Sequence, residues 1–539
     1  MSSNSSSSNW LSRLWQGPAL APMQEPVFRM LWVAWLFANM TMWMNDVAAA
    51  WLMTNLTTSP VMVALVQTAS TLPVFLLGIP SGAMADIVDR RKYFAVTQLW
   101  VSVNALVLAG LSLADALSAP LLLGLTFVNG VGLAMRWPVF SAIVPEIVGK
   151  ERMPAALALN GISMNLSRVV GPALAGSIIS AAGSAAVFVL NTLLALVSFV
   201  IVMRWRTQPK VSALPGERFV GAMRVGLQHV RQSSRMKIVM MRVFLFFFQA
   251  TALMALLPLV AKRLHGGGPG TFTAMLGAVG VGAVAAALYF PQLRAKFSRD
   301  EFVRTGTIVH AVLSVVVVWA PEVWIALIAL LGLGAAWIST ANSLSVSAQM
   351  ALPDWVRARG MSIYQMALMG GAAFGSVVWG QVAQTGSVRM AVEIAAVLGP
   401  LIYFLTAKLS VNGGEDVDFS LAPPRPQPAM AVPVEDSEGP VMVTIEYHID
   451  MTRRDEFVAV MEKTRRARLS LGVLSWGLFR DTSVVGCYVE YFVDENWVEH
   501  QRRLARFTAD DYELSLQRRS FQLKQEALII RRYVSERAG

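Results

Sequence analysis

Three polar side chains share one face of an otherwise apolar segment near the N-terminus. Between Phe28 and Met53, residues Asn39, Trp43 and Asp46 follow one another at spacings of four and three. In a helix these spacings place the three side chains in one stripe. A carboxylate in apolar surroundings is costly and is a candidate for function by default. Asp46 is therefore predicted to bind and release a proton. A solvated position at the end of the segment is the alternative.

Two arginines interrupt later apolar segments of the same half of the chain. Arg136 stands in the fourth segment, and Arg168 follows Asn165 in the fifth. An aspartate that faces a cavity near two cations can exchange a proton as its surroundings change. A fixed structural ion pair remains open as the alternative. The residues predicted to line a polar cavity are Asn39, Trp43, Arg136, Asn165 and Arg168. Glu393 is a second candidate for proton exchange, and His310 is a further titratable group.

The fifth segment also carries a helix-packing pattern. Gly171, Pro172 and Gly176 stand within six residues of one another. Proline interrupts the hydrogen-bond ladder of a helix, and glycine permits close approach of a neighbouring helix. The small residues of this segment recur at constant offset in the eleventh, for example as Gly370 and Gly375. Such a register favours an internal repeat of two equivalent halves.

The elements that must position these residues are twelve apolar segments. Hydrophobic residues make up 55% of the chain and charged residues 15%, and the mean hydropathy is +0.52. A soluble chain carries more charge. The segments are long enough to cross a bilayer core of about 30 Å as helices. The predicted fold is an all-α polytopic membrane protein with two six-helix halves. The predicted domains are a flexible N-terminus (1–25), a six-helix bundle (26–203), a cytoplasmic linker (204–237), a second six-helix bundle (238–410), a linker (411–440) and a soluble domain (441–539).

The charge pattern sets the predicted orientation. The net charge is +11, but the cations alternate between short loops instead of gathering on a soluble face, which argues against nucleic acid and for the bilayer as partner. Lys and Arg concentrate on one side of the membrane, where the two termini and the central loop also fall. By the positive-inside rule this side is the cytoplasm. A localisation in the bacterial inner membrane with both termini cytoplasmic follows.

The loop after the second segment contains a recognisable motif. Gly82 is followed four residues later by Asp86 and then by the cations Arg90, Arg91 and Lys92. The pattern resembles the signature loop of the major facilitator superfamily, although Asp89 stands where a second glycine is usual. The resemblance implies a conformational-switch loop formed by Gly82, Asp86, Arg90 and Arg91.

Further residues narrow the resemblance. Asp46 is followed by Trp51, by the run from Leu56 to Pro60 and by Pro73, and later come Arg136, Arg168 and the Gly171 to Pro172 pair. This set is similar to the branch that includes enterobactin exporters and transmembrane secretion effectors. The resemblance implies secondary active export of a small molecule, siderophore-like or lipophilic, by proton antiport. A multidrug or macrolide efflux pump is the alternative.

The tail after residue 440 has a different composition. Val441 to Ile449, Leu474 to Arg480, Val484 to Phe492 and Ala527 to Val534 are predicted strands, with helices after the first and third. This order is ferredoxin-like. With Trp476, Glu490 and His500 on that frame, the tail resembles the small domains related to antibiotic-biosynthesis monooxygenases. A homodimer through the sheet, with Trp476 in the interface, is predicted.

The alternative to a tail that only dimerises the transporter is a tail that acts as an enzyme. In that interpretation His448, Trp476, Trp497 and His500 line a small oxygenase pocket. The favoured prediction is a transporter and not an enzyme, with no cofactor and no metal site. Cys487 is the one cysteine of the chain, which excludes an internal disulfide.

Overall fold

The computed structural model describes residues 18–148, 152–205, 219–264, 267–294, 297–411, 420, 422, 432–523 and 528–536. The chain divides into two compact units. The helical unit comprises Met1–Ser212, Met240–Val346 and Tyr364–Asn412. The tail unit comprises Ala213–Val239, Ser347–Ile363 and Gly413–Gly539, so it includes segments that the sequence assigns to the linker and to the second helical half.

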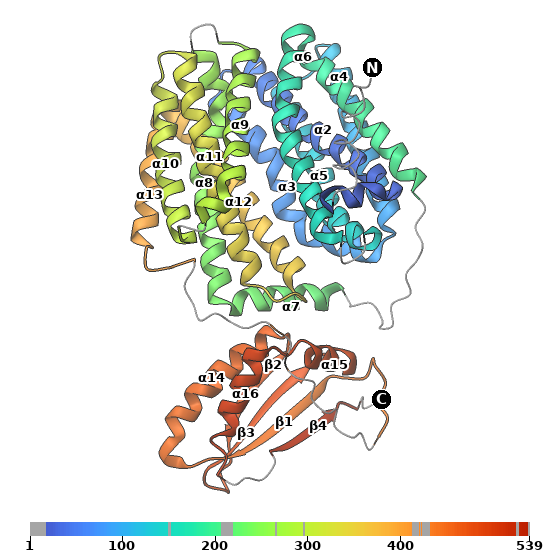
Figure 1. Cartoon of the computed structure of the whole chain (residues 1–539), viewed down its shortest axis with the longest axis vertical. Coiled ribbons are helices and arrows are strands. Elements are labelled where there is room, and N and C mark those ends of the chain that lie inside the picture. The colour runs from blue at the N-terminus through green and yellow to red at the C-terminus, as the bar shows by residue number, and fades with distance from the viewer. Residues whose placement is uncertain are drawn as a thin grey trace, which may run out of the picture. The chain divides into compact units, whose positions relative to one another are not determined.

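Long helices form the helical unit (Figure 1). The N-terminal half contains α2 (Pro26–Leu56), α3 (Pro60–Ile87), α4 (Arg90–Leu113), α5 (Ala119–Ile147) and α6 (Met153–Arg204). The C-terminal half contains α8 (Ser234–Arg263), α9 (Pro269–Arg294), α10 (Arg299–Trp319), α11 (Val323–Met350), α12 (Arg357–Thr385) and α13 (Val388–Leu405). Each of the twelve predicted apolar segments falls in one of these helices, although three of them run one to four residues past the helix end. A short 3-10 helix, η1 (Pro18–Gln24), precedes them within the region predicted to be flexible.

Ten helices among the described residues are long and apolar enough to cross a membrane. Two features explain the difference from twelve. The element α6 contains two predicted segments, which meet at Gly183, where a φ of 80° breaks the helical geometry. The helix α2 is long enough, but its polar residues make it less apolar than the ten, and it is not one of them.

The helices begin and end where local chemistry dictates. Proline stands in the first turn of α2, α3 and α5, where its missing N–H leaves no bond unmade. Asp89 caps α4 by accepting a hydrogen bond from the backbone N–H of Lys92 at 3.1 Å. Asp89, which departs from the glycine of the resembled motif, is thus the N-cap of the helix that follows the loop.

The core of the helical unit runs through both halves. One buried cluster includes Met44 and Phe188 of the N-terminal half with Leu256 and Leu330 of the C-terminal half. A second cluster around Trp35 and Phe94 belongs to the N-terminal half. The two halves therefore pack on each other as one apolar body in this structure.

The tail contains a four-stranded antiparallel sheet with the strand order β2-β3-β1-β4. Its elements are β1 (Val441–His448), η3 (Met451–Arg453), α14 (Arg454–Ser470), β2 (Ser475–Arg480), β3 (Cys487–Asp494), α15 (Trp497–Ala505), α16 (Ala509–Arg519) and β4 (Ile529–Val534). The helices α14 and α16 cover one face of the sheet (Figure 1). Val443, Ile445 and Tyr447 of β1 point to this face and pack against Phe457 and Met461 of α14.

The strand β3 begins later than its apolar pattern predicts. The sequence places a strand from Val484, whereas the structure begins it at Cys487. Asp481 Oδ1 accepts hydrogen bonds from the backbone N–H groups of Ser483 and Val484, and Gly486 has a φ of 82°. These contacts form a turn, which the alternation of apolar residues does not reveal.

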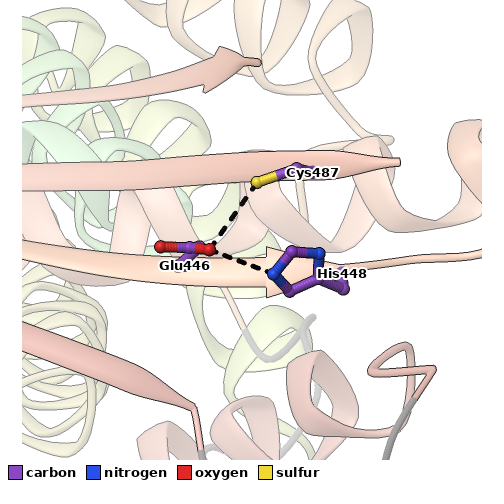
Figure 2. Close-up of side chains that lie close together, drawn as sticks. All are labelled: Glu446, His448 and Cys487. Carbon is purple, nitrogen blue, oxygen red and sulfur yellow. Dashed lines mark hydrogen bonds and ion pairs between the residues drawn. The ribbon is translucent and has the colours of Figure 1, made fainter. Parts of the chain in front are cut away.

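The other face of the sheet carries no helix among the described residues. Alternate residues of β1 point there, and the cross-strand pair His448 and Cys487 lies at its edge beside Glu446 (Figure 2). The same face exposes apolar side chains, with Phe479 60% and Tyr533 44% exposed. Trp476 does not belong to it. Its indole N–H donates to Glu490 Oε1 at 3.0 Å within the core, which corrects its predicted place in a dimer interface.

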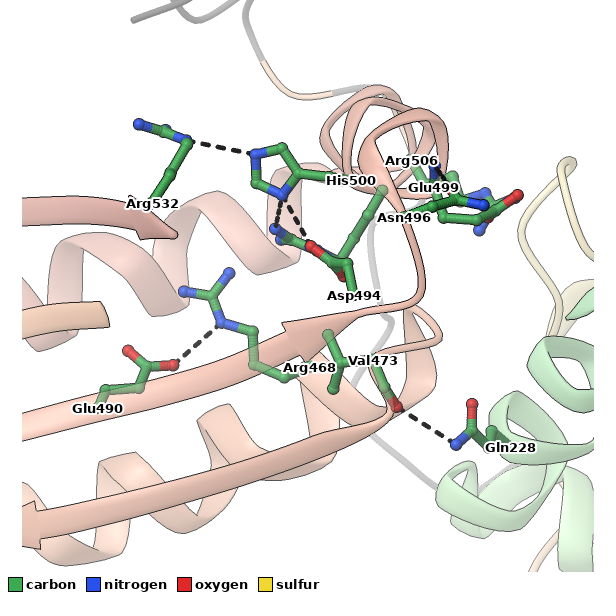
Figure 3. A network of polar contacts seen from close by, with 11 residues as sticks. Gln228, Arg468, Val473, Glu490, Asp494, Asn496, Glu499, His500, Arg506 and Arg532 are labelled. Carbon is green, nitrogen blue, oxygen red and sulfur yellow. Dashed lines mark hydrogen bonds and ion pairs between the residues drawn. The ribbon is translucent and has the colours of Figure 1, made fainter. Parts of the chain in front are cut away.

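The linker helix α7 (Phe219–Gln232) packs on the tail within the tail unit. Gln228 donates to the carbonyl of Val473 at 3.3 Å (Figure 3), and the carbonyl of Ser470 lies 3.2 Å from His229 Nδ1. Arg224 forms an ion pair with Glu495 at 2.8 Å. The amphipathic pattern of this helix therefore reflects protein packing.

Candidate functional site

Arg136 of α5 and Asn39 of α2, both predicted to line a cavity, meet in the structure. The guanidinium of Arg136 donates to the carbonyl of Ala38 and, at 3.3 Å, to Asn39 Oδ1. It also lies 5.1 Å from the centroid of the Trp35 ring, a cation–π distance. Arg136 is 2% exposed, and no ion pair to it occurs among the described residues. The helix α2 thus holds a buried positive charge.

Several buried donors on α2 and α5 have no acceptor within the described part of the chain. They include Arg136 Nε, Asn39 Nδ2 and the indole N–H of Trp43. A buried donor left without a partner costs about 1–3 kcal/mol. A bound water or an acceptor from outside the protein would satisfy them.

Arg168 of α6 connects the two halves. Its guanidinium lies 5.7 Å from the ring centroid of Trp43 on α2 and 5.4 Å from that of Trp337 on α11. The cation therefore stands between aromatic rings from the N-terminal and C-terminal halves. Asn165 lies on the same helix, and its side chain is outside the described residues.

Asp46 is separate from this group. Its Oδ1 accepts a hydrogen bond from the hydroxyl of Ser70 on α3 at 2.9 Å. No ion pair from Asp46 to Arg136 or Arg168 occurs among the residues that the structure describes. The stripe predicted on α2 thus divides: Asn39 and Trp43 approach the arginines, and Asp46 contacts α3.

The other titratable candidates belong to the C-terminal half. Glu393 of α13 accepts a hydrogen bond from the indole of Trp319 at 2.6 Å, and Trp319 is 55% exposed, so the pair lies at the surface of the bundle. His310 is buried between Phe246 and Trp337, with ring centroids 5.7 and 6.1 Å away. His310 therefore belongs to an aromatic cluster that continues through Trp337 to Arg168.

Arg242 is the buried arginine of α8, and it has a structural partner. Its guanidinium donates to the carbonyls of Thr406 and Leu409 at 2.6 and 3.1 Å and stacks 4.1 Å from the Tyr403 ring. These carbonyls follow the last turn of α13, where backbone acceptors lack helical partners. Arg242 thus caps a helix within the C-terminal half.

Lys262 joins the halves at the end of the bundle where α2 meets α3. Its ammonium donates to the carbonyl of Thr54 at 2.6 Å and to Asn55 Oδ1 at 2.9 Å, in the last turn of α2. A cation at a helix C-terminus satisfies free carbonyls and matches the helix dipole. At the same end the hydroxyl of Ser59 donates to Gln384 Oε1 at 2.8 Å. Nothing in the residues next to Lys262 indicates this contact.

The glycines of α6 lie at helix contacts. A Cβ at Gly171 would stand 2.9 Å from Cβ of Trp43, so α6 and α2 approach closely there. A Cβ at Gly176 would stand 1.5 Å from Thr273 Oγ1 on α9, across the two halves. Pro172 lies inside α6 between these two contacts.

Their equivalents in α12 make the same two kinds of contact, with the two positions exchanged. A Cβ at Gly375 would stand 2.6 Å from the carbonyl oxygen of Phe248 on α8, within the C-terminal half. One at Gly370 would stand 2.8 Å from the Phe75 ring on α3, across the halves. The fifth and eleventh segments thus each pack on the first helix of their own half and the second helix of the other half. This agrees with the internal repeat in the sequence.

The signature loop is described in part. Gly82 and Asp86 lie in the last turns of α3, and their side chains are outside the described residues. Arg90 is the first residue of α4, and Arg91 Nη2 donates to the carbonyl of Met203 near the end of α6 at 2.5 Å. The loop is therefore tied to α6 within the N-terminal half.

The four residues of the oxygenase alternative do not converge. His448 pairs with Cys487 at one end of β3, whereas His500 contacts Asp494 at the other end, with Nδ1 and Oδ2 2.7 Å apart (Figure 3). Arg532 Nε donates to His500 Nε2 at 3.3 Å, and the Trp497 ring stacks on His500 at 5.2 Å. Burial lowers the pKa of His500, and Asp494 opposes that shift. His500 is thus a packed and bonded residue.

Glu490 is the centre of a second buried network. Burial opposes its ionisation, but the ion pair with Arg468 at 3.0 Å and the nearby Arg518 hold the pKa of Glu490 below its usual range. Tyr447 and Trp476 each donate a hydrogen bond to its carboxylate, at 2.8 and 3.0 Å. A buried charge with this many partners is a structural element of the tail.

The helical architecture matches that of known transporters. The nucleoside transporter NupG superposes with a TM-score of 0.56 at 12% identity, over 71% of this chain and 98% of that one. A bacterial homologue of the human lysosomal transporter Spinster superposes with a TM-score of 0.55 at 13% identity, over 72% and 98% of the two chains. At such identities the similarity shows the fold alone.

The sequence comparisons define the family. The family model of the transmembrane secretion effectors matches residues 17–539, and the chain belongs to that family. Macrolide efflux protein A of Streptococcus pyogenes is 22% identical over 245 residues, which cover 45% of this chain and 60% of that protein. The Staphyloferrin A transporter of Staphylococcus aureus is 20% identical over 331 residues, which cover 60% of this chain and 81% of that protein.

Proposed function

We propose that this protein is a secondary transporter that exports a small organic anion across the bacterial inner membrane by alternating access. The observation that carries the proposal is the group of buried donors on Arg136, Asn39 and Trp43, which lack acceptors among the described residues. An anionic group would supply those acceptors in charge-assisted hydrogen bonds, which are about twice as strong as neutral ones. The balance of Arg136 and Arg168 against the single Asp46 agrees with an anionic substrate.

The proposal includes twelve crossings. The ten apolar helices become twelve if α2 crosses and if α6 crosses twice by turning at Gly183. An even number of crossings places the two ends of the chain on one side, and the distribution of Lys and Arg favours the cytoplasm.

The aromatic cluster supports an apolar or aromatic part in the substrate. Phe246, Phe247 and His310 gather around Trp337, which also approaches Arg168. Rings from the C-terminal half therefore stand next to a cation of the N-terminal half. An aromatic anion such as a catechol carboxylate, as in siderophores, suits this combination.

A proton antiport mechanism is part of the proposal. Asp46 is held by Ser70 and by no arginine among the described residues, so it is free to change its protonation state without breaking an ion pair. Protonation of a carboxylate inside the bundle removes an isolated charge, which is how a gradient can bias the two states of a transporter. Glu393, bonded to the exposed Trp319, is the weaker candidate for this role.

Counterflow in proteoliposomes tests the proposal. The full chain is reconstituted, and exchange of labelled 2,3-dihydroxybenzoate is measured with and without a pH gradient, alongside a neutral analogue, catechol. We expect saturable exchange of the anion and its accumulation against a concentration gradient when a pH gradient is imposed. Exchange no faster than in protein-free liposomes would contradict the proposal for this substrate class.

A macrolide is the second candidate substrate. The relative in Streptococcus pyogenes carries that name, and the cluster around Trp337 offers the apolar surface that such a molecule needs. The same vesicles loaded with labelled erythromycin distinguish the two. Transport of the macrolide with no transport of the aromatic anion would replace the anion proposal by this one.

We also propose that the tail is a ferredoxin-like domain which dimerises the transporter and has no catalytic role. Its elements follow the order β-α-β-β-α-β, with the last helix in two pieces. The exposed apolar residues Met442, Phe479, Ile529 and Tyr533 share the face without helices, and a second copy of the same face would cover them. Sedimentation of the full chain in detergent should give a dimer, and Phe479→Asp should give a monomer. A monomeric wild-type chain would contradict the dimer.

A further inference from the structure

Three side chains with metal-binding atoms meet on the face of the tail sheet that no described helix covers. Glu446 and His448 are two residues apart on β1, so they project from the same side of the strand. Cys487 of β3 is the direct cross-strand partner of His448. The ligands come from positions separated by about forty residues, which is why the sequence, with its single cysteine, predicted no metal site.

The separations suit one ion. His448 Nε2 lies 3.0 Å from Glu446 Oε1, and Cys487 Sγ lies 3.9 Å from the same oxygen (Figure 2). The nitrogen, oxygen and sulfur all lie within 4.8 Å of one another. Around a tetrahedral Zn²⁺, bond lengths of about 2.0–2.3 Å place such ligand atoms about 3.3–3.6 Å apart. Side-chain rotations that move the ligand atoms by a few tenths of an ångström up to about 1 Å therefore bring the three atoms onto one ion.

We propose that Glu446, His448 and Cys487 form a binding site for a divalent first-row transition ion, with Zn²⁺ as the best match. A thiolate, an imidazole and a carboxylate are ligands of zinc, whereas magnesium and calcium select oxygen ligands alone. Three protein ligands leave a fourth tetrahedral position for water. On binding, the thiol of Cys487 loses its proton to solvent as the sulfur–metal bond forms.

The surroundings of the three ligands favour the site. Cys487 is 3% exposed, so its sulfur is held by the sheet, whereas Glu446 and His448 are half-buried and leave a path for an ion. The backbone N–H of His448 donates to Gln522 Oε1 at 3.0 Å, which fixes the end of β1. A bound ion would connect the end of β1 to the start of β3 and stabilise that edge of the sheet.

Cobalt substitution in the full chain tests the site directly. The purified, tag-free transporter in detergent is stripped with a chelator and titrated with Co²⁺, whose thiolate charge-transfer band reports a sulfur ligand. Since Cys487 is the only cysteine of the chain, a thiolate band can arise from no other residue. We expect one Co²⁺ per chain with this band and with the intense visible bands of tetrahedral cobalt. Zn²⁺ should abolish both.

Variants separate the site from non-specific binding. Cys487→Ser should remove the thiolate band. His448→Ala and Glu446→Gln should each weaken Co²⁺ binding by at least about tenfold, because even outer-shell partners of metal sites are worth about 10–100-fold. Glu462→Gln, an exposed carboxylate on α14, is the matched control and should change nothing. A wild-type titration without a thiolate band overturns the proposal. So does unchanged affinity in both His448→Ala and Glu446→Gln.

Discussion

The two helical halves place their buried polar groups in different ways. In the N-terminal half, Arg136 approaches Asn39 and leaves donors without acceptors among the described residues, and Asp46 has one hydroxyl partner. In the C-terminal half, Arg242 caps the end of α13 and His310 lies among aromatic rings, although Arg242 Nε and His310 Nε2 also lack partners among the described residues. The packing of α6 and α12 is nevertheless equivalent in the two halves.

This difference indicates a division of roles on a repeated scaffold. A shared packing pattern keeps the halves able to move against each other, because glycines stand at the contacts in both. In the proposed function, the N-terminal half supplies the charges that a substrate and a proton require. The C-terminal half supplies an apolar wall and uses its buried arginine for stability. Variants in matched positions of the two halves test this division.

One of the two largest effects is expected at the glycine contact between the halves. Gly176→Ala places a Cβ against Thr273. Overpacking of this kind costs about 1–3 kcal/mol, which lowers the population of the conformation in which α6 and α9 touch by roughly 5- to 150-fold. Transport in proteoliposomes should fall by that factor, and Thr273→Ala should restore much of it in the double variant.

Two matched variants control this prediction. Gly161→Ala, with no atom within 4 Å of its Cβ, should transport normally. Gly375→Ala, which meets Phe248 inside the C-terminal half, should lower the melting temperature more than it alters the cycle. Full transport by Gly176→Ala would show that α6 and α9 need not approach closely.

The second effect is on substrate binding. Arg136→Gln should weaken binding of the anion by about 10- to 150-fold, since hydrogen bonds to charged groups are worth about 1.5–3 kcal/mol. Arg136→Lys keeps the charge but loses the planar fork, so an intermediate affinity is expected. Equilibrium binding of the labelled anion to the purified chain gives the dissociation constants.

Arg242→Gln is the matched variant in the C-terminal half. It should lower the melting temperature and leave the dissociation constant unchanged, because Arg242 bonds the end of α13. Equal losses of affinity in Arg136→Gln and Arg242→Gln would remove the proposed division between the halves.

A smaller effect is expected at the contact between Lys262 and α2. Lys262→Gln removes a cation from a helix C-terminus, worth about 0.3–1 kcal/mol, or roughly a two- to fivefold shift toward the state in which this end is open. In a Cys487→Ser background, Met53→Cys is a reporter, since Met53 is fully buried near this contact. Lys262→Gln should accelerate maleimide labelling of this cysteine by about two- to fivefold. Arg263→Gln is the control and should leave the labelling rate unchanged. A slower labelling rate in Lys262→Gln would contradict a role of Lys262 in keeping this end of the bundle closed.

The smallest effect concerns the tail unit and pH. Burial lowers the pKa of His229, and the hydrogen bond that its ring donates to the Ser470 carbonyl opposes that shift. The free histidine therefore binds a proton more readily than the packed one. The contact of α7 with the tail is thus stable above the ordinary pKa of about 6.5 and weakens as pH falls below it, by up to about 1.4 kcal/mol per pH unit.

Hydrogen exchange of α7 checks this pH dependence. After correction for intrinsic rates, protection should fall between pH 7.5 and pH 5.5 in the wild type, and His229→Gln should lose part of that dependence. The pH dependence that remains in His229→Gln reports other groups. One of them is His500, because burial also lowers its pKa. Identical pH profiles for the two chains would exclude His229 as the cause.

Much of the helical fold is readable in the sequence because burial in a bilayer demands long apolar runs. All twelve segments lie in helices, and the repeat of glycines in α6 and α12 appears as equivalent packing. The break at Gly183 also falls between two predicted segments. The strand pattern of the tail is confirmed apart from its turn at Gly486.

Contacts between distant segments were not readable in this way. Lys262 reaches Thr54 across 208 positions, and Cys487 meets Glu446 across 41. The amphipathic face of α7 has the same pattern whether it meets a membrane or α14. Trp476 has an apolar ring that suits an interface, but the buried carboxylate of Glu490 binds its N–H in the core. The tertiary partners of these side chains decide what each of them does. The neighbouring residues in the sequence do not indicate which partners those are.

The central claim is that the N-terminal half couples substrate movement to protons through Asp46. Asp46→Asn keeps the size of the side chain and a hydrogen-bond acceptor for Ser70 but removes its titration. The decisive measurement compares, in the same proteoliposomes, counterflow without any gradient and accumulation driven by a pH gradient. The account predicts that Asp46→Asn retains counterflow and loses accumulation. An Asp46→Asn protein that still concentrates the anion against its gradient would contradict it.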